Sequence, residues 1–533
     1  MARQEASRSA QFASQRWDRI CVLIFWQKCD GVRPKCGQCA RSLSLQDCEF
    51  ADDGQVTERQ RLEVKIANVE SRINELTTSR APFILHNPYP GEHNSASRPP
   101  RSGRSSVQPL PFSSSPLHST ALRNPPASTE VPLVKLEPLS QFGFFLNVRR
   151  FKDAAKGRSG QRPADVLLDV VHLWAIHLSG SDEFVVYEAS YLSRALRTAA
   201  NALSGTHSSS TVLHSIQAFI LLSYYFLQNT RFLEGKYHLS AAVSLVISSG
   251  LHRIRSADSR SLSPPFRTTR MSPPRDAVEE AERINAFWAV LTLNNCLTTA
   301  DGSPSNISYT DPDSRIDTPW PLDINAPGLQ SQILPNSSFG TLTAFLGNQP
   351  DNGASASALH AKAAILFEQA SRLASQYRPD MNDKRQFYES FKSIDTLIER
   401  FKLSLPTVQS HSSRELIVIH TLAHVATIQL HNPFVREADA SRSRVVTSAR
   451  TIVANLAQVP LDTFVYIDPI MGVFVAELGR FRRRRPLNSP VPPEERLVTD
   501  TIETVLAAMN VFAPRCPIMN SQLIAMQQLY RGH

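Results

Sequence analysis

Five of the seven cysteines lie in one short stretch near the start of the chain, between Cys21 and Cys48. The last four, Cys29, Cys36, Cys39 and Cys48, are separated by six, two and eight residues. A pair two residues apart can place two thiolates on one metal ion, and the longer loops let further cysteines complete the tetrahedral set that zinc prefers. Metal binding would also fold a segment that has almost no apolar core. The spacing therefore predicts a structural zinc site rather than disulfides, which would be spread through a secreted chain.

The stretch around these cysteines, KCDGVRPKCGQCARSLSLQDCEF, resembles the second half of the fungal binuclear zinc cluster, the DNA-binding domain of a family of fungal transcription factors. In that family six cysteines bind two zinc ions and share two of the thiolates. Pro34 matches the proline of the family's inter-helix loop. The resemblance implies that the third to sixth ligands of the cluster are Cys29, Cys36, Cys39 and Cys48.

The first half of the family's pattern is missing. Its first two ligands belong at positions that hold Arg19 and Val22, and the basic run that should follow reads VLIFWQK, in which only Lys28 is charged. Cys21 supplies a fifth thiolate and is the weakest candidate ligand, because one cysteine cannot replace two. Two hypotheses remain open. Either the cluster is truly incomplete and holds one zinc ion or none, or the coding sequence just before Lys28 is wrong and an intact cluster holds two.

Basic side chains remain around the cysteines. The resemblance implies that the module binds double-stranded DNA in the major groove, at a short GC-rich triplet. We expect the surviving basic side chains around the cluster to contact chiefly phosphates, which position a protein on DNA without specifying its sequence. The expected DNA-binding residues are Lys28, Arg33, Lys35 and Arg41.

A helix with an apolar seam is predicted over residues 55–78. Its apolar residues alternate between spacings of four and three, the a/d pattern of a coiled coil, and charged residues lie off the seam. Such a short seam suits either a parallel coiled coil between two copies of the chain or one amphipathic helix packed on its own domain. We expect the coiled coil, and hence a homodimer, because no apolar partner segment lies nearby in sequence. The seam residues are Leu62, Ile66, Val69, Ile73 and Leu76.

Residues 79–160 are rich in serine, proline, asparagine and arginine, and such a segment cannot bury enough apolar surface to offset its ordering entropy. We predict a disordered linker there and an all-helical domain over 161–533, where helical periodicity persists and strand-like alternation is nearly absent. Gly250 and Gly302 are expected to end two helices, and the apolar run Leu213–Leu227 indicates a helix buried on all sides. The predicted helices span 163–179, 187–204, 211–229, 232–250, 276–299, 357–376, 385–403, 413–431, 440–457, 464–484 and 494–512.

The helical region resembles the middle homology region of the same transcription factors. The stretch SIQAFILLSYYFLQNTRFLEGKYHLSAAVSLVISSGLHR is followed by EEAERINAFWAVLTLNNCLTTADGSPSNIS, in which Arg283, Phe287 and Trp288 lie on one helix. We expect Phe287 and Trp288 in the core. The segment Leu416–Phe434 is similar to a late helix of that region. In the family this region is regulatory, so the resemblance implies a domain that controls the terminal modules.

Other residues that could do chemistry have simpler explanations. His420 and His424 lie four apart on one helix face, but no third zinc ligand is evident, and we expect a hydrogen-bonded core pair. Cys296 and Cys516 are isolated and are expected to be plain thiols. The basic run Arg480–Arg485 is expected to be a solvated helix end rather than a nuclear import signal. The sequence has no Gly-rich phosphate loop, nucleophile elbow or paired catalytic carboxylates, so we expect no enzyme.

The 533 residues are 42% hydrophobic and 20% charged, which excludes wholesale disorder and a membrane-spanning bundle. The net charge of +9 suits a polyanionic partner. The expected fold is mostly α, with a small zinc module at 1–50.

We predict a nuclear, zinc-dependent, sequence-specific transcription factor that regulates RNA polymerase II transcription in a fungus. We expect it to be a homodimer and to interact with the transcription machinery. We expect no interaction with a membrane. The rival hypothesis is a helical regulatory or ligand-sensing protein whose degenerate cluster no longer binds DNA specifically.

Overall fold

The computed structural model describes residues 137–472 and 505–531. Within these ranges it leaves out 159–160, 180–181, 205–207, 257–270, 310–314, 327–328, 330–339 and positions 382, 436, 465 and 467. All of the described residues belong to one compact unit, Ser119–His533. The predicted zinc module, the predicted coiled coil and the predicted linker up to residue 136 lie outside the described residues.

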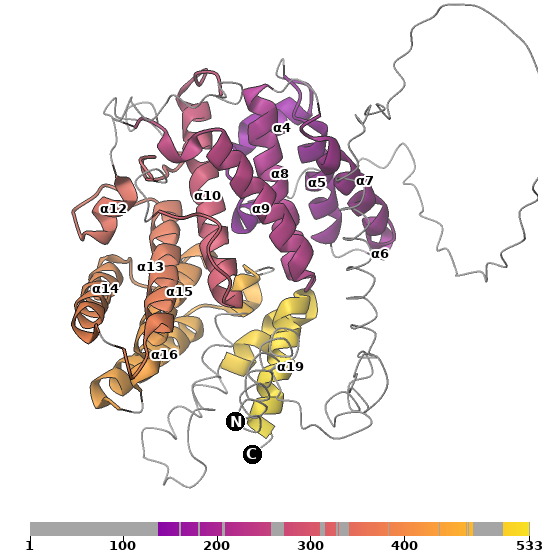
Figure 1. Ribbon diagram of the computed structural model, residues 1–533. Coiled ribbons are helices and arrows are strands. Elements are labelled where there is room, and N and C mark those ends of the chain that lie inside the picture. Colours follow the sequence, from indigo (N-terminus) through magenta and orange to yellow (C-terminus); the bar gives the residue numbers. More distant parts are fainter. Residues whose placement is uncertain are drawn as a thin grey trace, which may run out of the picture. The chain divides into compact units, whose positions relative to one another are not determined.

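The described residues form the all-α domain that the sequence predicted, and no strand occurs among them (Figure 1). Predicted helices from 163–179 to 440–457 are all present, with ends that differ by at most three residues. Short 3₁₀ helices are η2 (Glu137–Phe142), η3 (Leu251–Arg253), η7 (Asn432–Phe434), η8 (Leu461–Thr463) and η10 (Ala513–Arg515). The α-helices are α4 (Val148–Ala155), α5 (Asp165–His177), α6 (Asp182–Val185), α7 (Glu188–Asn201), α8 (Ser209–Gln228), α9 (Phe232–Ser248), α10 (Ala277–Asp301), α12 (Thr341–Leu346), α13 (Ala356–Gln376), α14 (Lys384–Ser404), α15 (Arg414–His431), α16 (Asp439–Gln458) and α19 (Pro517–Arg531).

Local side-chain chemistry sets many of the helix ends. The side chains of Ser208, Asp276 and Ser355 cap α8, α10 and α13, and each accepts a hydrogen bond from the backbone N–H three residues on. Gly302 ends α10 in left-handed backbone with φ 71°, and Gly250 follows α9 with φ 73°. Glycine adopts this conformation without steric penalty, so both predicted stops are confirmed.

Two groups of helices share one hydrophobic core and meet at α10. In the first group α8 packs against α5, α7 and α9, and in the second α15 packs against α13, α14 and α16. α10 contacts α8 and α9 as well as α13, and Figure 1 shows it between the two groups. Near the C-terminus, α19 returns to contact α8.

Helix α8 is the central element of the first group. Its side chains from Ser215 to Gln228 are all buried. Among the described helices it is long and apolar enough to cross a membrane, but 78% of that stretch is buried inside the protein. A helix that is apolar all round is expected at the centre of a bundle. The predicted burial of this helix is confirmed.

The helical domain begins earlier than the sequence predicted. Residues 137–155, which fell within the predicted linker, form η2 and α4. Phe142 stacks on Trp174 of α5 with ring centroids 4.3 Å apart. Gln217 of α8 holds the same stretch, because its Nε2 donates to the Gly143 carbonyl at 3.1 Å. The cause is the aromatic run FGFF, whose burial offsets the ordering entropy of this stretch.

Candidate functional site

The residues predicted to bind zinc, to bind DNA and to form the dimer seam lie outside the described residues, so their arrangement stays a prediction. The same holds for the basic run Arg480–Arg485. The predicted site residues in question are Cys21, Cys29, Cys36, Cys39 and Cys48; Lys28, Arg33, Lys35 and Arg41; and Leu62, Ile66, Val69, Ile73 and Leu76.

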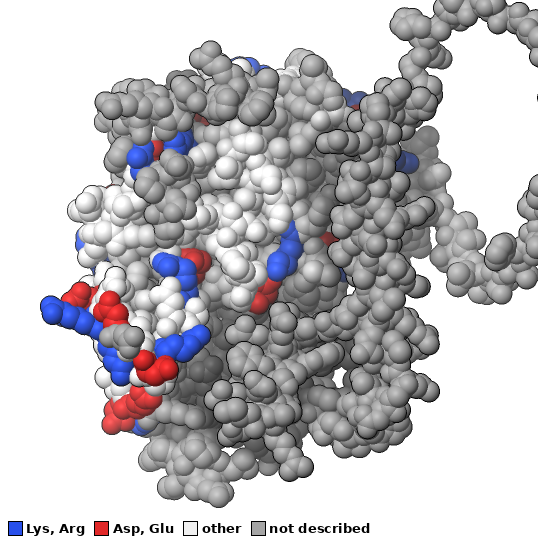
Figure 2. All heavy atoms as spheres, in the orientation of Figure 1, with Lys and Arg blue, Asp and Glu red and all other residues white. Residues whose placement is uncertain are grey.

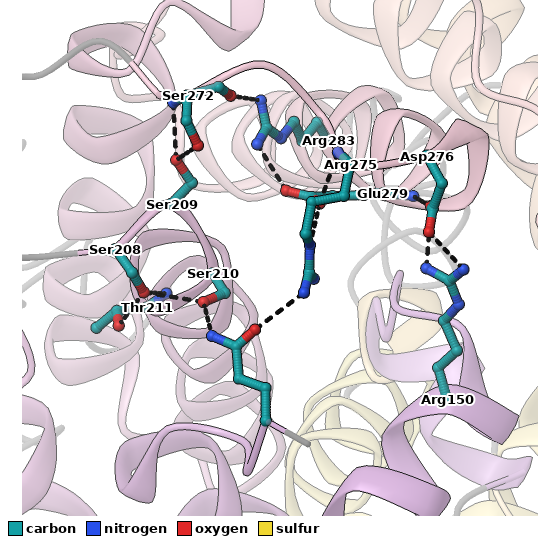
Figure 3. A network of polar contacts seen from close by, with 11 residues as sticks. Arg150, Ser208, Ser209, Ser210, Thr211, Ser272, Arg275, Asp276, Glu279 and Arg283 are labelled. Carbon is teal, nitrogen blue, oxygen red and sulfur yellow. Dashed lines mark hydrogen bonds and ion pairs between the residues drawn. The ribbon is translucent and has the colours of Figure 1, made fainter. Parts of the chain in front are cut away.

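Within the described residues, a network of charged and hydroxyl side chains joins the N-terminal ends of α8 and α10 to α4 (Figure 3). Asp276 caps α10, and its Oδ1 and Oδ2 accept hydrogen bonds from Arg150 of α4 at 3.0 and 2.7 Å. This bidentate ion pair lowers the pKa of the Asp276 carboxyl. We call the network the α8–α10 junction; its members are Arg150, Gln161, Ser208, Ser209, Ser210, Thr211, Ser272, Arg275, Asp276, Glu279 and Arg283.

Glu279, in the first turn of α10, is buried against two arginines. Its Oε1 accepts from Arg283 Nη2 at 2.6 Å and its Oε2 from Arg275 Nε at 2.7 Å. Burial alone would raise the pKa of this carboxyl, but the hydrogen bonds from both arginines lower it. Arg283 is only 6% exposed, and its Nη1 donates to the Ser272 carbonyl at 2.6 Å. The buried ion pair therefore ties α10 to the segment that precedes it.

Hydroxyl groups gather at the start of α8. Ser208 caps the helix, and Ser209 Oγ accepts from the Ser272 N–H at 2.9 Å, with the two hydroxyl oxygens also 2.9 Å apart. Gln161 connects this group to the charged side, because its Nε2 donates to Ser210 Oγ at 2.6 Å and its Oε1 accepts from Arg275 Nη1 at 3.0 Å. Both carboxylates of the junction are engaged by arginines. The arrangement is therefore suited to holding charge rather than to moving protons.

The aromatic side chains of α10 lie in the core, as predicted. Phe287 is fully buried and Trp288 is 1% exposed. Trp288 Nε1 donates to the Pro319 carbonyl at 2.6 Å, and its ring stacks on Trp320 with centroids 4.4 Å apart. Helix α10 thus fixes the proline-rich segment that follows it in the chain.

The profile of one protein family, the fungal specific transcription factor domain, matches residues 144–411. The match covers about half of the chain and contains α4 to α14, including the α8–α10 junction. The chain belongs to the fungal specific transcription factor domain family. Searches of the curated proteins and of the solved structures returned no significant match.

Family membership makes the chain a transcription regulator of the fungal type and confirms the predicted resemblance to the middle homology region. It also supports the expectation that the protein is not an enzyme. The packed domain extends past the matched residues, because α15 contacts α13 and α19 contacts α8. The helical domain of this regulator is therefore longer than its family segment.

Two histidines on α15 of the regulator do not form the predicted hydrogen-bonded pair. His420 Nε2 lies 2.8 Å from a backbone carbonyl oxygen in the preceding loop, whereas the buried His424 Nδ1 has no hydrogen-bond partner. Burial, followed by the charge of Lys402, lowers the pKa of His424 to about 3, so this ring is neutral at physiological pH. No group of three possible metal ligands occurs in the described part of the chain. Cys296 and Cys516 are free, buried thiols, as expected.

Sequence reasoning missed a buried carboxylate that links the end of the domain to its first group of helices. Asp468, 4% exposed, accepts a hydrogen bond on Oδ2 from the Tyr224 hydroxyl of α8 at 3.4 Å. Its Oδ1 accepts from the Ile470 N–H at 2.9 Å. Burial raises the pKa of Asp468 to about 7, and the carboxyl of Glu415 adds to the shift. Residue spacing carries no signal of this site, because packing between distant segments creates it.

Proposed function

We propose that the chain is a nuclear, zinc-dependent, sequence-specific DNA-binding transcription factor that regulates RNA polymerase II transcription in a fungus. One observation carries the proposal. The regulatory domain at 144–411 follows, in the same chain, a cysteine run with zinc-ligand spacing, Cys29–Cys48. A regulator of transcription needs a module that binds DNA at its target genes, and the cysteine run is the candidate for that module.

The donor set of the proposed module suits one zinc ion. Cys29, Cys36, Cys39 and Cys48 supply four thiolates, the number that a tetrahedral structural site takes. Two ions would need the two missing ligands, which the arginine and valine in their places do not provide. Bound zinc would fold the module, since so small a segment has little apolar core.

DNA binding would combine the basic side chains with dimerisation. Lysine and arginine side chains near the cysteines would contact phosphates and hold the module against the duplex. Pairing of two copies through the 55–78 helix would set the spacing of the half-sites. The helical domain would then relay its state to the terminal modules and to the transcription machinery.

Zinc analysis of the purified full chain tests the proposal directly. We expect about one zinc ion per chain and its loss in Cys39→Ser. Cys21→Ser is the matched control, because a fifth thiolate is not needed for four ligands, and this variant should keep its zinc. Loss of zinc in both variants would assign Cys21 to the site and contradict the ligand set proposed here.

Selection from random-sequence DNA tests the specificity. The full chain should enrich duplexes that carry a short GC-rich triplet, and Cys39→Ser should enrich none. Binding by the parent chain should fall steeply with salt concentration, because phosphate contacts release counterions. A parent chain that enriches no sequence would contradict sequence-specific binding.

A second candidate function is a helical regulatory or ligand-sensing protein that no longer binds DNA specifically. It is favoured by Arg19 and Val22, which stand where two ligands belong. A zinc-free chain with a shallow salt dependence of DNA binding would support it. Detection of the tryptic peptide Ile20–Lys28 in the native host would show that the incomplete cluster is real. A transcript that encodes C-x2-C and basic residues there would show an intact one.

A further inference from the structure

We propose that Ser272 is a phosphorylation site and that its phosphate docks at the start of α8. The local sequence, MSPPR, places a proline directly after the serine, which is the acceptor pattern of proline-directed protein kinases. Ser272, Pro273 and Pro274 are all exposed, so a kinase can reach them in the folded domain.

The start of α8 is chemically suited to a phosphate. Ser272 Oγ lies 2.9 Å from the hydroxyl of Ser209, in the first turn of α8. That turn contains no acidic residue, whereas α10 has a capping aspartate and two glutamates at its start. Helix α8 therefore supplies no anion of its own at the positive end of its dipole. A phosphoryl group on Ser272 would bring up to two negative charges and three acceptor oxygens to this position.

Two arginines beside Ser272 give a second and independent reason to expect a phosphate to dock here. Arg283 is more than nine-tenths buried, its Nη1 donates to the Ser272 carbonyl, and its buried Nε has no hydrogen-bond partner. Arg275 keeps 65% of its side chain exposed three residues after Ser272. Both guanidinium groups share the single carboxylate of Glu279. Figure 3 shows the two arginines and Ser272 within the same network. Phosphate oxygens would therefore meet charged donors that already belong to the junction.

The transfer requires ATP and a proline-directed kinase. Ser272 Oγ attacks the γ-phosphorus, the Oγ–P bond forms as the bond to the bridging oxygen breaks, and ADP leaves. The hydroxyl proton passes to the catalytic base of the kinase. In the product, the start of α8 and the segment before α10 interact more strongly, because phosphate oxygens replace the single hydroxyl contact between Ser272 and Ser209.

Ser263 provides a matched control for the modification, because the same Ser-Pro-Pro sequence occurs there, outside the described residues. The folded full chain is incubated with a proline-directed kinase and ATP, and the modified sites are mapped by mass spectrometry. We expect phosphate on Ser272 and its loss at this site in Ser272→Ala and Pro273→Ala, with Ser263 unaffected by either change. Modification of Ser272 only after the chain is unfolded would overturn the proposal.

Full chains that carry phosphoserine at 272 or at 263 test the docking. The second pKa of phosphoserine is ordinarily about 6, and phosphorus NMR titration should place it about one unit lower at Ser272 only. Phosphate at Ser272 should also raise Tm by about 2 °C. Arg275→Gln should remove most of both effects, whereas Arg442→Gln, which breaks a comparable exposed pair in α16, should leave them. The docking would be overturned if the two phosphorylated chains had the same second phosphate pKa and the same Tm.

Discussion

Trp320 is held by side chains from several parts of the fold. Its ring stacks on Trp288 of α10, and Lys362 Nζ of α13 lies 4.9 Å from its ring centroid. The same ammonium donates to the Asp351 carboxylate and, at 2.8 Å, to the Gly353 carbonyl. A buried ammonium is tolerated here because the ring face, the carboxylate and the carbonyl replace its water.

Gly353→Ala is expected to destabilise the domain. The added Cβ would lie 2.5 Å from Cγ of Trp320, and the ring cannot move without loosening its stack on Trp288. We expect a loss of about 1–3 kcal/mol in the free energy of unfolding, measured by urea denaturation. Gly472→Ala is the control, because its Cβ would meet no atom closer than 3.4 Å. The same midpoint for Gly353→Ala and the parent chain would contradict tight packing at Trp320.

At the residue scale, the sequence predicted apolar burial better than polar burial. Phe287 and Trp288 were placed correctly in the core because large aromatic side chains are rarely left exposed. The pair of Glu279 and Arg283 was not anticipated as buried, since oppositely charged residues four apart on a helix are usually solvated. Its burial comes from the neighbouring segment around Ser272, which the spacing of the pair does not reveal.

At the element scale, the ends of the helices predicted between residues 163 and 457 agree with the structure to within three residues. The helix predicted over 464–484 is wrong at its start, because residues 464, 466 and 468 are not helical. Capping hydroxyls and glycines act within one turn, so the signal lies beside the boundary in the sequence. The short helices α4, α6 and α12 were missed, and so was the 15-residue α19. Two turns carry too little periodicity to stand out, and α4 depends on burial of Phe151 against other elements.

Gly302→Ala is expected to weaken the end of α10. Gly302 has φ 71°, and the next N–H, that of Ser303, donates to the Thr298 carbonyl at 2.9 Å, which closes the helix end. Alanine in this backbone conformation costs about 1 kcal/mol, visible as a lower urea midpoint. Gly302→Asn should cost less, because asparagine tolerates left-handed backbone. Equal effects of alanine and asparagine would argue against the backbone conformation as the cause.

At the scale of the whole molecule, Asp468 links the two groups of helices. It follows α16 of the second group and contacts Tyr224 of α8 in the first. Burial raises its pKa to about 7 from an ordinary value of 3.8, so its charge responds to neutral pH. Figure 2 shows that few Lys, Arg, Asp or Glu side chains appear over the middle of the described face in that view.

Stability should fall with rising pH because of Asp468. Between pH 4 and 7 the folded chain keeps a proton that the unfolded chain has released, so stability from this group is full below pH 4 and is lost as pH rises through 7. Asp468→Asn is neutral throughout, and should exceed the parent chain by roughly 2–4 kcal/mol at pH 8 while matching it near pH 4. Urea denaturation at both pH values measures the difference. A difference that does not change with pH would contradict burial of the ionised form.

The sequence by itself determined that most of the described chain is helical, where the helices between residues 163 and 457 lie and to which family its middle region is similar. These features depend on periodicity and capping, which act over a few neighbouring residues. Only the tertiary structure decided that residues 137–155 belong to the helical domain, that Glu279 and Arg283 are buried, and that Asp468 meets α8. Those features depend on burial by residues far away in the chain, and burial is what changes the chemistry of a charged group.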